Sequence, residues 1–168
     1  MSTLEPLASK YRPKSLDEFI GQQHLVGANG PIRKFLETGN VPSMIFWGPP
    51  GTGKTTLAYI ISLNLYYDFY KMQAVNSGKE ELRKILKIAL NNQKYNKKTM
   101  LFLDEIHRWN KAQQDTLLPY VEKGVITLIG ATTENPSFTI ISPLLSRAKV
   151  FVFKQHTKED IATLLKRV

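Results

Sequence analysis

The chain has 168 residues, of which 42% are hydrophobic and 22% charged, a composition typical of one globular domain rather than a disordered or repetitive chain. It contains no cysteine, which excludes disulfides and thiolate metal sites, and no run of residues is typical of a signal peptide or a membrane span. Lysine and arginine number 23 against 14 acidic residues, and the formal charge of +9 favours a polyanionic partner such as nucleic acid, although a solvated basic surface would look the same.

The predicted elements alternate between strands and helices along the chain. Apolar runs rich in β-forming residues predict strands over residues 43–47, 72–75, 99–103, 125–131 and 150–153. Helical patterns precede, separate and follow them, over residues 31–38, 55–65, 80–90, 111–122, 142–147 and 157–168. Because strands joined by crossover helices run parallel, this order predicts an α/β fold with a parallel sheet.

Residues typical of helix ends support these boundaries. Pro31 and Gly39 bound the first helix, and Asn110 is a typical cap for the helix over residues 111–122. Thr157 caps the last helix, with Asp160 three residues later. The apolar periodicity of that helix is still running at Val168, so we expect the native protein to continue into a further helical domain.

The motif GPPGTGKT at residues 48–55 matches the phosphate-loop pattern G-x-x-x-x-G-K-[ST] between a buried strand and a helix. Glycines let backbone N–H groups turn toward a phosphate, the helix start adds the positive end of its dipole, and Lys54 can lie beside the β and γ phosphates. The motif predicts ATP as the ligand. The candidate binding residues are Gly48, Pro49, Pro50, Gly51, Thr52, Gly53, Lys54, Thr55 and Thr56.

Two adjacent carboxylates follow the predicted strand over residues 99–103. Asp104, at the carboxyl end of that strand, can hold Mg²⁺ together with the Thr55 hydroxyl, and Glu105 can accept the proton of an attacking water. In isolation the two acids could be a polar cap on a buried strand, but the phosphate loop upstream favours the catalytic interpretation.

Two further candidates come later in the chain. The segment LIGATTENP predicts a strand that ends in polar residues, and of these Thr133 is our candidate for orienting the water, with ordinary strand-end capping as the alternative. The segment SPLLSRA places Arg147 near the end of a short helix. In an isolated chain we expect Arg147 to face solvent or pair with an acid, whereas in a ring it could reach a neighbour's nucleotide.

These motifs together resemble the AAA+ ATPases. GPPGTGKTT, LFLDE, ATTEN and LLSR occur in the order of that superfamily, and SKYRPKSLDEFIGQQHLV resembles the adenine-side segment of its clamp-loader branch. The longer segments MIFWGPPGTGKTTLA, LDEIHRWNKAQQDTLLPYVEKGVITLIGATTENPSF and LLSRAKVF resemble the replication-associated recombination protein A family, whose eukaryotic relative is the Werner-helicase-interacting protein. The resemblance covers essentially the whole chain.

The resemblance implies a five-stranded sheet of order 5-1-4-3-2 with helices on both faces. Residues 1–155 would form the nucleotide-binding domain, with 1–30 as its adenine-side segment, and residues 156–168 would begin a helical lid domain. The implied roles are catalysis for Lys54, Glu105 and Thr133, a finger acting in trans for Arg147, and restraint of the catalytic glutamate for Asn76. Pro13, Ile20 and Gly21 fall where relatives contact adenine.

The resemblance also implies a function. We expect DNA-stimulated ATP hydrolysis with Mg²⁺ by a homo-oligomer that acts at stalled forks, single-strand gaps or junctions in replication, recombination and repair. Single-strand-binding protein and other replication factors are candidate partners. The zinc finger of the eukaryotic relative is missing from the sequence, so we expect a bacterial, cytoplasmic, nucleoid-associated protein.

Two alternatives stay open at this point. Asp104, Glu105, Ile106 and His107 spell the DExH box of superfamily 2 helicases, but those enzymes use a second RecA-like domain for which this chain has no room. A nucleotide-dependent scaffold that does not rely on hydrolysis is the other alternative, although such a protein would have no use for Glu105 or Arg147.

Overall fold

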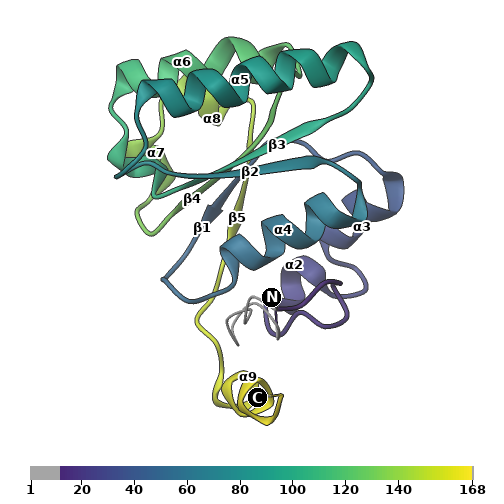
Figure 1. Ribbon diagram of the computed structural model, residues 1–168. Helices are drawn as coiled ribbons and strands as arrows, with labels where there is room; N and C mark the ends of the chain where they lie inside the picture. Colours follow the sequence, from purple (N-terminus) through teal and green to yellow (C-terminus); the bar gives the residue numbers. More distant parts are fainter. Residues whose placement is uncertain (1–11, 168) are drawn as a thin grey trace, which may run out of the picture.

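A five-stranded, all-parallel sheet forms the centre of the protein, for which a computed structural model describes residues 12–167 (Figure 1). The spatial order is β2-β3-β4-β1-β5, which is the predicted order 5-1-4-3-2 read from the other edge. The strands are β1 (Met44–Trp47), β2 (Asp68–Gln73), β3 (Thr99–Asp104), β4 (Thr127–Thr132) and β5 (Lys149–Val152).

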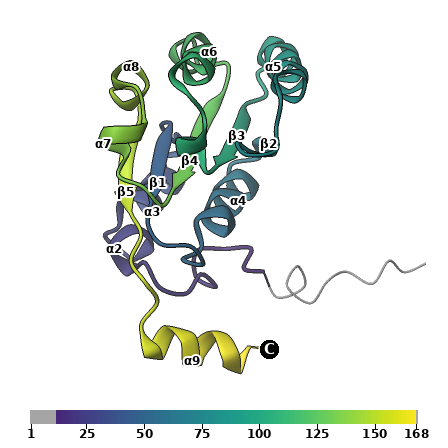
Figure 2. The same ribbon diagram turned by 90° about the vertical axis from the view of Figure 1, so that its left-hand side faces the viewer.

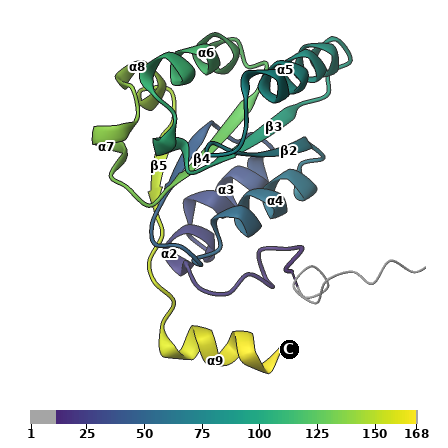
Figure 3. The ribbon, with the colours of Figure 1, turned by 60° about the vertical axis from the view of Figure 1, so that its left-hand side comes forward.

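Helices cover both faces of the sheet (Figure 2). One face carries α2 (Gln23–Val26), α3 (Pro31–Thr38) and α4 (Lys54–Asn64), and the other carries α5 (Lys79–Lys94), α6 (Lys111–Glu122), α7 (Pro136–Thr139) and α8 (Ser142–Leu145). A short 3₁₀ turn, η1 (Ile106–Arg108), follows β3. The last helix, α9 (Lys158–Lys166), lies away from the sheet at the end of an extended segment (Figure 3).

Side chains of the central strands alternate between the two faces and build two cores. Met100 and Phe102 pack with the α4 side, whereas Leu101 and Leu103 pack with the α5 and α6 side. All four side chains are fully buried, as expected for a central strand covered on both faces. This burial fixes the register of β3 and therefore the position of the carboxylates that follow it.

Most predicted boundaries are confirmed. Gly39 ends α3 in the left-handed conformation with φ 74°. Asn110 and Thr157 each form a capping box, with Gln113 and Asp160 respectively, at the starts of α6 and α9. The part of the predicted adenine-side segment in residues 1–11, and Val168 at the end of the predicted lid segment, lie outside the described residues.

Two strand predictions are wrong in their boundaries. The second strand was predicted over residues 72–75 but runs over Asp68–Gln73, because Asp68 pairs with Thr99 and the pairing continues in register to Asp104. The fourth strand was predicted to begin at Val125, whereas β4 begins at Thr127. Val125 and Ile126 donate their backbone N–H groups to Tyr120 and so belong to the turn that leaves α6.

Among residues 12–167, none of the helices has both the length and the apolar character that a membrane crossing demands.

Candidate nucleotide-binding site

A cleft of about 330 Å³ opens where the phosphate loop meets the carboxyl ends of β3 and β4. It is lined by Pro50, Gly51, Thr52, Gly53, Lys54, Thr55, Thr56, Asp104, Glu105 and Thr133. Three segments that the sequence analysis treated separately therefore converge in one cavity. This is the place where ligands bind in open parallel sheets, just beyond the carboxyl ends of the strands.

The phosphate loop between β1 and α4 depends on two glycines. Gly51 and Gly53 have φ 73° and φ 94°, a left-handed conformation that other residues rarely adopt. At Gly53 a Cβ atom would also lie 2.7 Å from the Phe19 ring, which is buried beneath the loop. The loop then enters α4 at Lys54, so the unpaired N–H groups of that helix point toward the cleft.

Lys54 is held over the loop by main-chain carbonyls. Its Nζ donates to the carbonyl oxygens of Gly48 and Pro49, each at 2.7 Å. Burial lowers the pKa of Lys54, and the charge of Asp104 acts in the opposite direction. An ammonium group that is partly desolvated and opposite one carboxylate interacts strongly with a phosphate brought into the cleft.

The two carboxylates lie at the end of β3, but their backbones differ. Asp104 is the last residue of the strand, and its Oδ1 accepts the backbone N–H of Glu105 at 3.0 Å. Glu105 has φ 54°, a left-handed conformation that is uncommon for a residue other than glycine. The turn directs the chain into η1 and places Glu105 in the lining of the cleft.

Mg²⁺ fits the donor set of this cleft. Asp104, Glu105 and the hydroxyls of Thr55 and Thr133 all line it, and Mg²⁺ prefers hard oxygen ligands such as carboxylates together with phosphate oxygens. The sequence analysis assigned Asp104 and Thr55 to the metal, and both side chains belong to the same cavity.

A histidine that the sequence analysis left without a role connects the two strand ends. His107, in η1, places Nδ1 2.9 Å from the Thr132 hydroxyl. That hydroxyl accepts the backbone N–H of Glu134 at 3.0 Å, and His107 Nε2 lies 4.0 Å from a carboxylate oxygen of Glu134. His107 therefore links the segment after Glu105 to the turn that carries Thr133. The only signal in the sequence was its position two residues after Glu105.

Arg147 and Asn76 do not lie in the lining of this cleft. Arg147 follows α8, and its Nε forms an ion pair with a carboxylate oxygen of Glu122 at 3.0 Å on the surface, as expected for the isolated chain. Asn76 lies in the turn after β2, where its amide is 3.4 Å from the side-chain oxygen of Gln73. Within one chain, neither Arg147 nor Asn76 lies among the residues that line the cleft.

The predicted adenine contacts, Pro13, Ile20 and Gly21, also lie outside the cleft lining. Gly21 is buried, and a Cβ there would lie 2.9 Å from the His156 ring. Gly21 therefore adjoins the segment that leads from β5 to α9.

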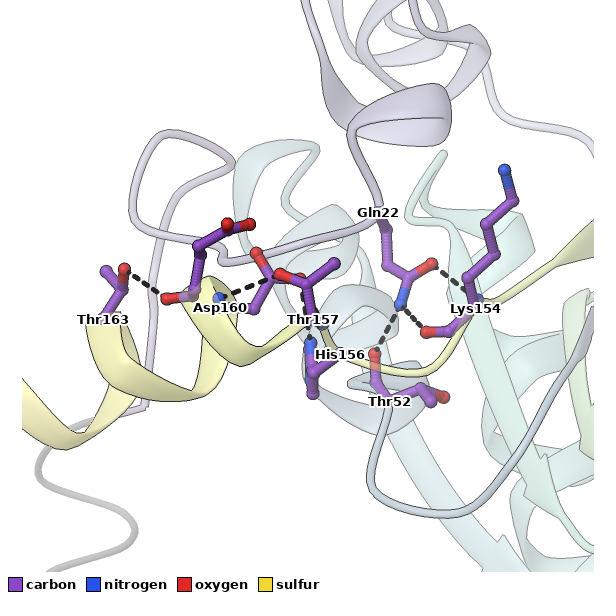
Figure 4. A network of polar contacts seen from close by, with 8 residues as sticks. Gln22, Thr52, Lys154, His156, Thr157, Asp160 and Thr163 are labelled. Carbon is purple, nitrogen blue, oxygen red and sulfur yellow. Dashed lines mark hydrogen bonds and ion pairs between the residues drawn. The ribbon is translucent and has the colours of Figure 1, made fainter.

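Gln22 ties this N-terminal segment to the phosphate loop, and sequence reasoning missed it (Figure 4). Its side-chain amide donates to the carbonyl oxygens of Lys154 at 2.6 Å and Thr52 at 3.4 Å, while its oxygen accepts the backbone N–H of Lys154 at 2.9 Å. Gln22 is buried and has φ 53°. The contact joins residues 132 positions apart, so no local pattern could have revealed it.

Comparisons with known proteins agree with this geometry. A family model described as "ATPase family associated with various cellular activities (AAA)" matches residues 44–156. The chain is 50% identical over 164 residues to replication-associated recombination protein A of Escherichia coli strain K12, covering 98% of the chain and 37% of that protein. It is 48% identical over 162 residues to the ATPase WRNIP1 of Dictyostelium discoideum, covering 96% of the chain and 18% of that protein.

A solved structure of a more distant protein shares the fold. The Thermotoga maritima RuvB Holliday junction branch migration motor superposes with a TM-score of 0.75 at 32% identity, over 94% of this chain and 53% of that one. The chain thus spans little more than a third of the E. coli relative it matches and about half of this structural neighbour.

Proposed function

The chain belongs to the AAA family of ATPases, and on that premise we propose that its cleft binds ATP with Mg²⁺ and hydrolyses the γ-phosphate in an oligomer that acts on DNA. One observation carries the proposal: Lys54, Asp104, Glu105 and Thr133, from three separate segments, line a single cleft at the carboxyl ends of the strands. Membership of that family and this combination of residues both point to nucleotide binding and ATP hydrolysis.

The phosphates would bind the backbone N–H groups of residues 51–56, with the Lys54 ammonium beside the β and γ phosphates. Asp104 and Thr55 would hold Mg²⁺, which when bound would neutralise charge on the phosphate oxygens. Adenine would then lie toward Pro13, Ile20 and Gly21, on the side where the N-terminal segment meets the start of α9. In this arrangement residues 1–155 are the nucleotide-binding domain and 156–168 begin the lid.

Hydrolysis would depend on Glu105, whose carboxylate would accept the proton of the attacking water. Thr133 would orient that water from the end of β4, and Asn76 would restrain Glu105 once nucleotide orders the turn after β2. Arg147 would stabilise the transition-state charge on the nucleotide of a neighbouring subunit, since within its own chain it pairs with Glu122.

DNA is the proposed macromolecular partner for two reasons. The formal charge is +9, and the E. coli relative is named for replication and recombination. The proposal includes action at forks, gaps or junctions with other replication factors, and a bacterial cytoplasmic, nucleoid-associated location.

The test is Glu105→Gln in the full-length protein, with Glu81→Gln on the exposed surface of α5 as the matched control. We expect Glu105→Gln to bind ATP normally while hydrolysis, measured with and without single-stranded DNA, falls about 10²-fold or more. Glu81→Gln should keep the full rate. Undiminished hydrolysis by Glu105→Gln would show that this carboxylate is not the base, and a scaffold that does not depend on hydrolysis would then be the better description.

A further inference from the structure

A second cavity, of about 850 Å³, is lined by residues of α5, α6 and the turns that precede them. The two helices lie next to each other on the same face of the sheet (Figure 2). It shares no lining residue with the nucleotide cleft. On the side away from α5, α6 packs against α8. A groove separates α6 from α5. The cavity is therefore separate from the proposed ATPase chemistry.

The two walls of this groove are apolar at helical spacing. Leu82, Leu86 and Leu90 follow one another every four residues along α5, and Leu90 is 43% exposed. Opposite them, α6 contributes Ala112, Thr116 and Tyr120, again every four residues. Each set of three forms a stripe along its helix, and the eight-residue separation of its first and last members corresponds to a little more than two helical turns, roughly 12 Å.

Trp109 closes the channel near the start of α6. Its indole N–H donates to the Ala74 carbonyl at 3.2 Å, and the residue is only 5% exposed. Because the polar atom already has a partner, the ring presents only apolar surface to the groove. A ligand would find hydrophobic contacts there rather than a hydrogen-bond donor.

The rim on the α5 side is uniformly positive. Lys79, Arg83 and Lys87, again spaced by four residues, line the groove, and no acidic residue does so. The adjoining surface of α5 is mixed, with Glu80, Glu81 and Lys84 together. Among residues 12–167, no ion pair involves Lys79, Arg83 or Lys87, so their charges are available to a partner.

We propose that this groove docks an amphipathic helical segment of a partner protein, with apolar anchors every three or four residues and acidic side chains beside them. The apolar channel accommodates the anchors, and the three basic residues along one rim complement the acids. Nucleic acid fits less well, because the leucines of α5 offer no stacking surface and Trp109, at 5% exposure, has little ring surface free to stack on a base. Helix-in-groove recognition is the physical mode that this geometry supports.

The test uses a fluorescein-labelled peptide of about 14 residues, with leucines at positions i, i+4 and i+8 and glutamates on the flanking positions, added to the full-length protein. Fluorescence anisotropy measures its dissociation constant. Comparison probes are a scrambled peptide, the same peptide with lysine in place of glutamate, and a single-stranded DNA oligonucleotide. We expect the acidic amphipathic peptide to bind more tightly than the scrambled and lysine peptides, and DNA not to displace it.

Paired variants locate the binding. Arg83→Glu with Lys87→Glu should weaken binding about tenfold, whereas Lys84→Glu with Lys94→Glu, the same charge change on the same helix outside the groove, should leave it unchanged. Leu90→Ser should weaken binding about fivefold, and Ile88→Ser should not, although Ile88 is 38% exposed on the same helix. All six changed positions are exposed, so the variants should fold, and unchanged ATP binding checks this.

Several results would overturn the proposal. One is equal peptide binding by the groove variants and their controls. Another is DNA competing for the groove with an affinity that falls in Arg83→Glu with Lys87→Glu. A third is a change of oligomeric state in Leu90→Ser, measured by sedimentation, which would assign the groove to a second copy of this chain. None of these readouts depends on whether Glu105 is the catalytic base.

Discussion

The phosphate-loop half of the proposed site and its arginine half are held in place by different kinds of contact. Lys54 is fixed by two main-chain carbonyls at 2.7 Å and is partly buried. Arg147 is fixed by one ion pair with Glu122, and the two side chains are 46% and 39% exposed. An exposed pair of this kind contributes roughly 0–1 kcal/mol, so releasing it requires little free energy.

This difference teaches how a site shared between subunits can be built. Groups that would act on the chain's own nucleotide are positioned by the backbone before any ligand arrives. The group that would act on a neighbour's nucleotide is kept at the surface by a weak contact that can be exchanged for a phosphate. Variants of the phosphate loop should therefore lose ATP binding, whereas variants of the arginine should lose hydrolysis and keep ATP binding.

The largest effect is expected at Lys54. Lys54→Ala removes the side-chain charge that contacts the loop carbonyls, so both ATP binding and hydrolysis should be lost in the full-length protein. Binding of a fluorescent ATP analogue and phosphate release measure the two losses, with exposed Lys84→Ala as the control. ATP affinity in the unchanged protein should also fall as the pH rises toward the lowered pKa of Lys54, because the ammonium is the form that attracts phosphate.

Arg147→Ala should distinguish the role of the arginine from that of the phosphate loop. We expect hydrolysis by the oligomer to fall about 10³-fold while ATP binding persists, since the guanidinium would act on a neighbour. Mixing Arg147→Ala with Lys54→Ala protein should restore part of the rate, because mixed rings contain some intact sites. Glu122→Gln, which breaks the ion pair but keeps the arginine, serves as the control with a nearly unchanged rate. A loss of ATP affinity in Arg147→Ala would contradict the distinction between the halves.

A smaller effect is expected at His107, which positions the strand ends without lining the cleft. His107→Gln and Thr132→Val should each lower kcat about tenfold, the cost of one hydrogen bond worth about 1.4 kcal/mol, and leave KM nearly unchanged. A merely structural role would lower the melting temperature and kcat and raise KM. Steady-state kinetics and thermal unfolding of the same samples distinguish the two.

The smallest effect concerns α9, outside the cleft. The backbone N–H of Thr157 donates to Asp160 and, as the main cause, lowers the pKa of that carboxyl. The carboxylate therefore stabilises the helix start above its ordinary pKa, and this contribution disappears as the pH falls through the lowered value. The protection factors of the α9 amides, which correct for the intrinsic exchange rate at each pH, should fall at low pH in the unchanged protein, whereas in Asp160→Asn they should lack this additional acid dependence.

Local chemistry was enough to predict most of the fold. The caps at Asn110 and Thr157 and the glycines of the phosphate loop are short-range signals, and the structure has them where they were expected. The second strand was predicted at the wrong residues because the apolar run over residues 72–75 resembles a strand, whereas Asp68, where the strand begins, is polar. Pairing with β3 decides where β2 begins, and Val75 at the end of that run is 58% exposed.

The site was predictable only in part for the same reason. The phosphate loop, Asp104 and Glu105 are contiguous motifs, and the parallel sheet brings them together. Gln22 and His107 act through contacts with residues distant in sequence, at Lys154 and Thr132, that only the folded chain reveals. Arg147 and Asn76 stay predictions, because their proposed partners belong to another subunit or to bound nucleotide.

Glu105 shows that a proposed catalytic group and folding stability can oppose each other. A side chain in the left-handed conformation costs about 1 kcal/mol relative to glycine, and Glu105 holds φ 54°. Glycine at this position would relax the backbone and stabilise the domain, yet it would delete a carboxylate from the lining of the cleft. Selection for thermal stability alone would therefore tend to replace Glu105, the residue on which ATP hydrolysis is proposed to depend.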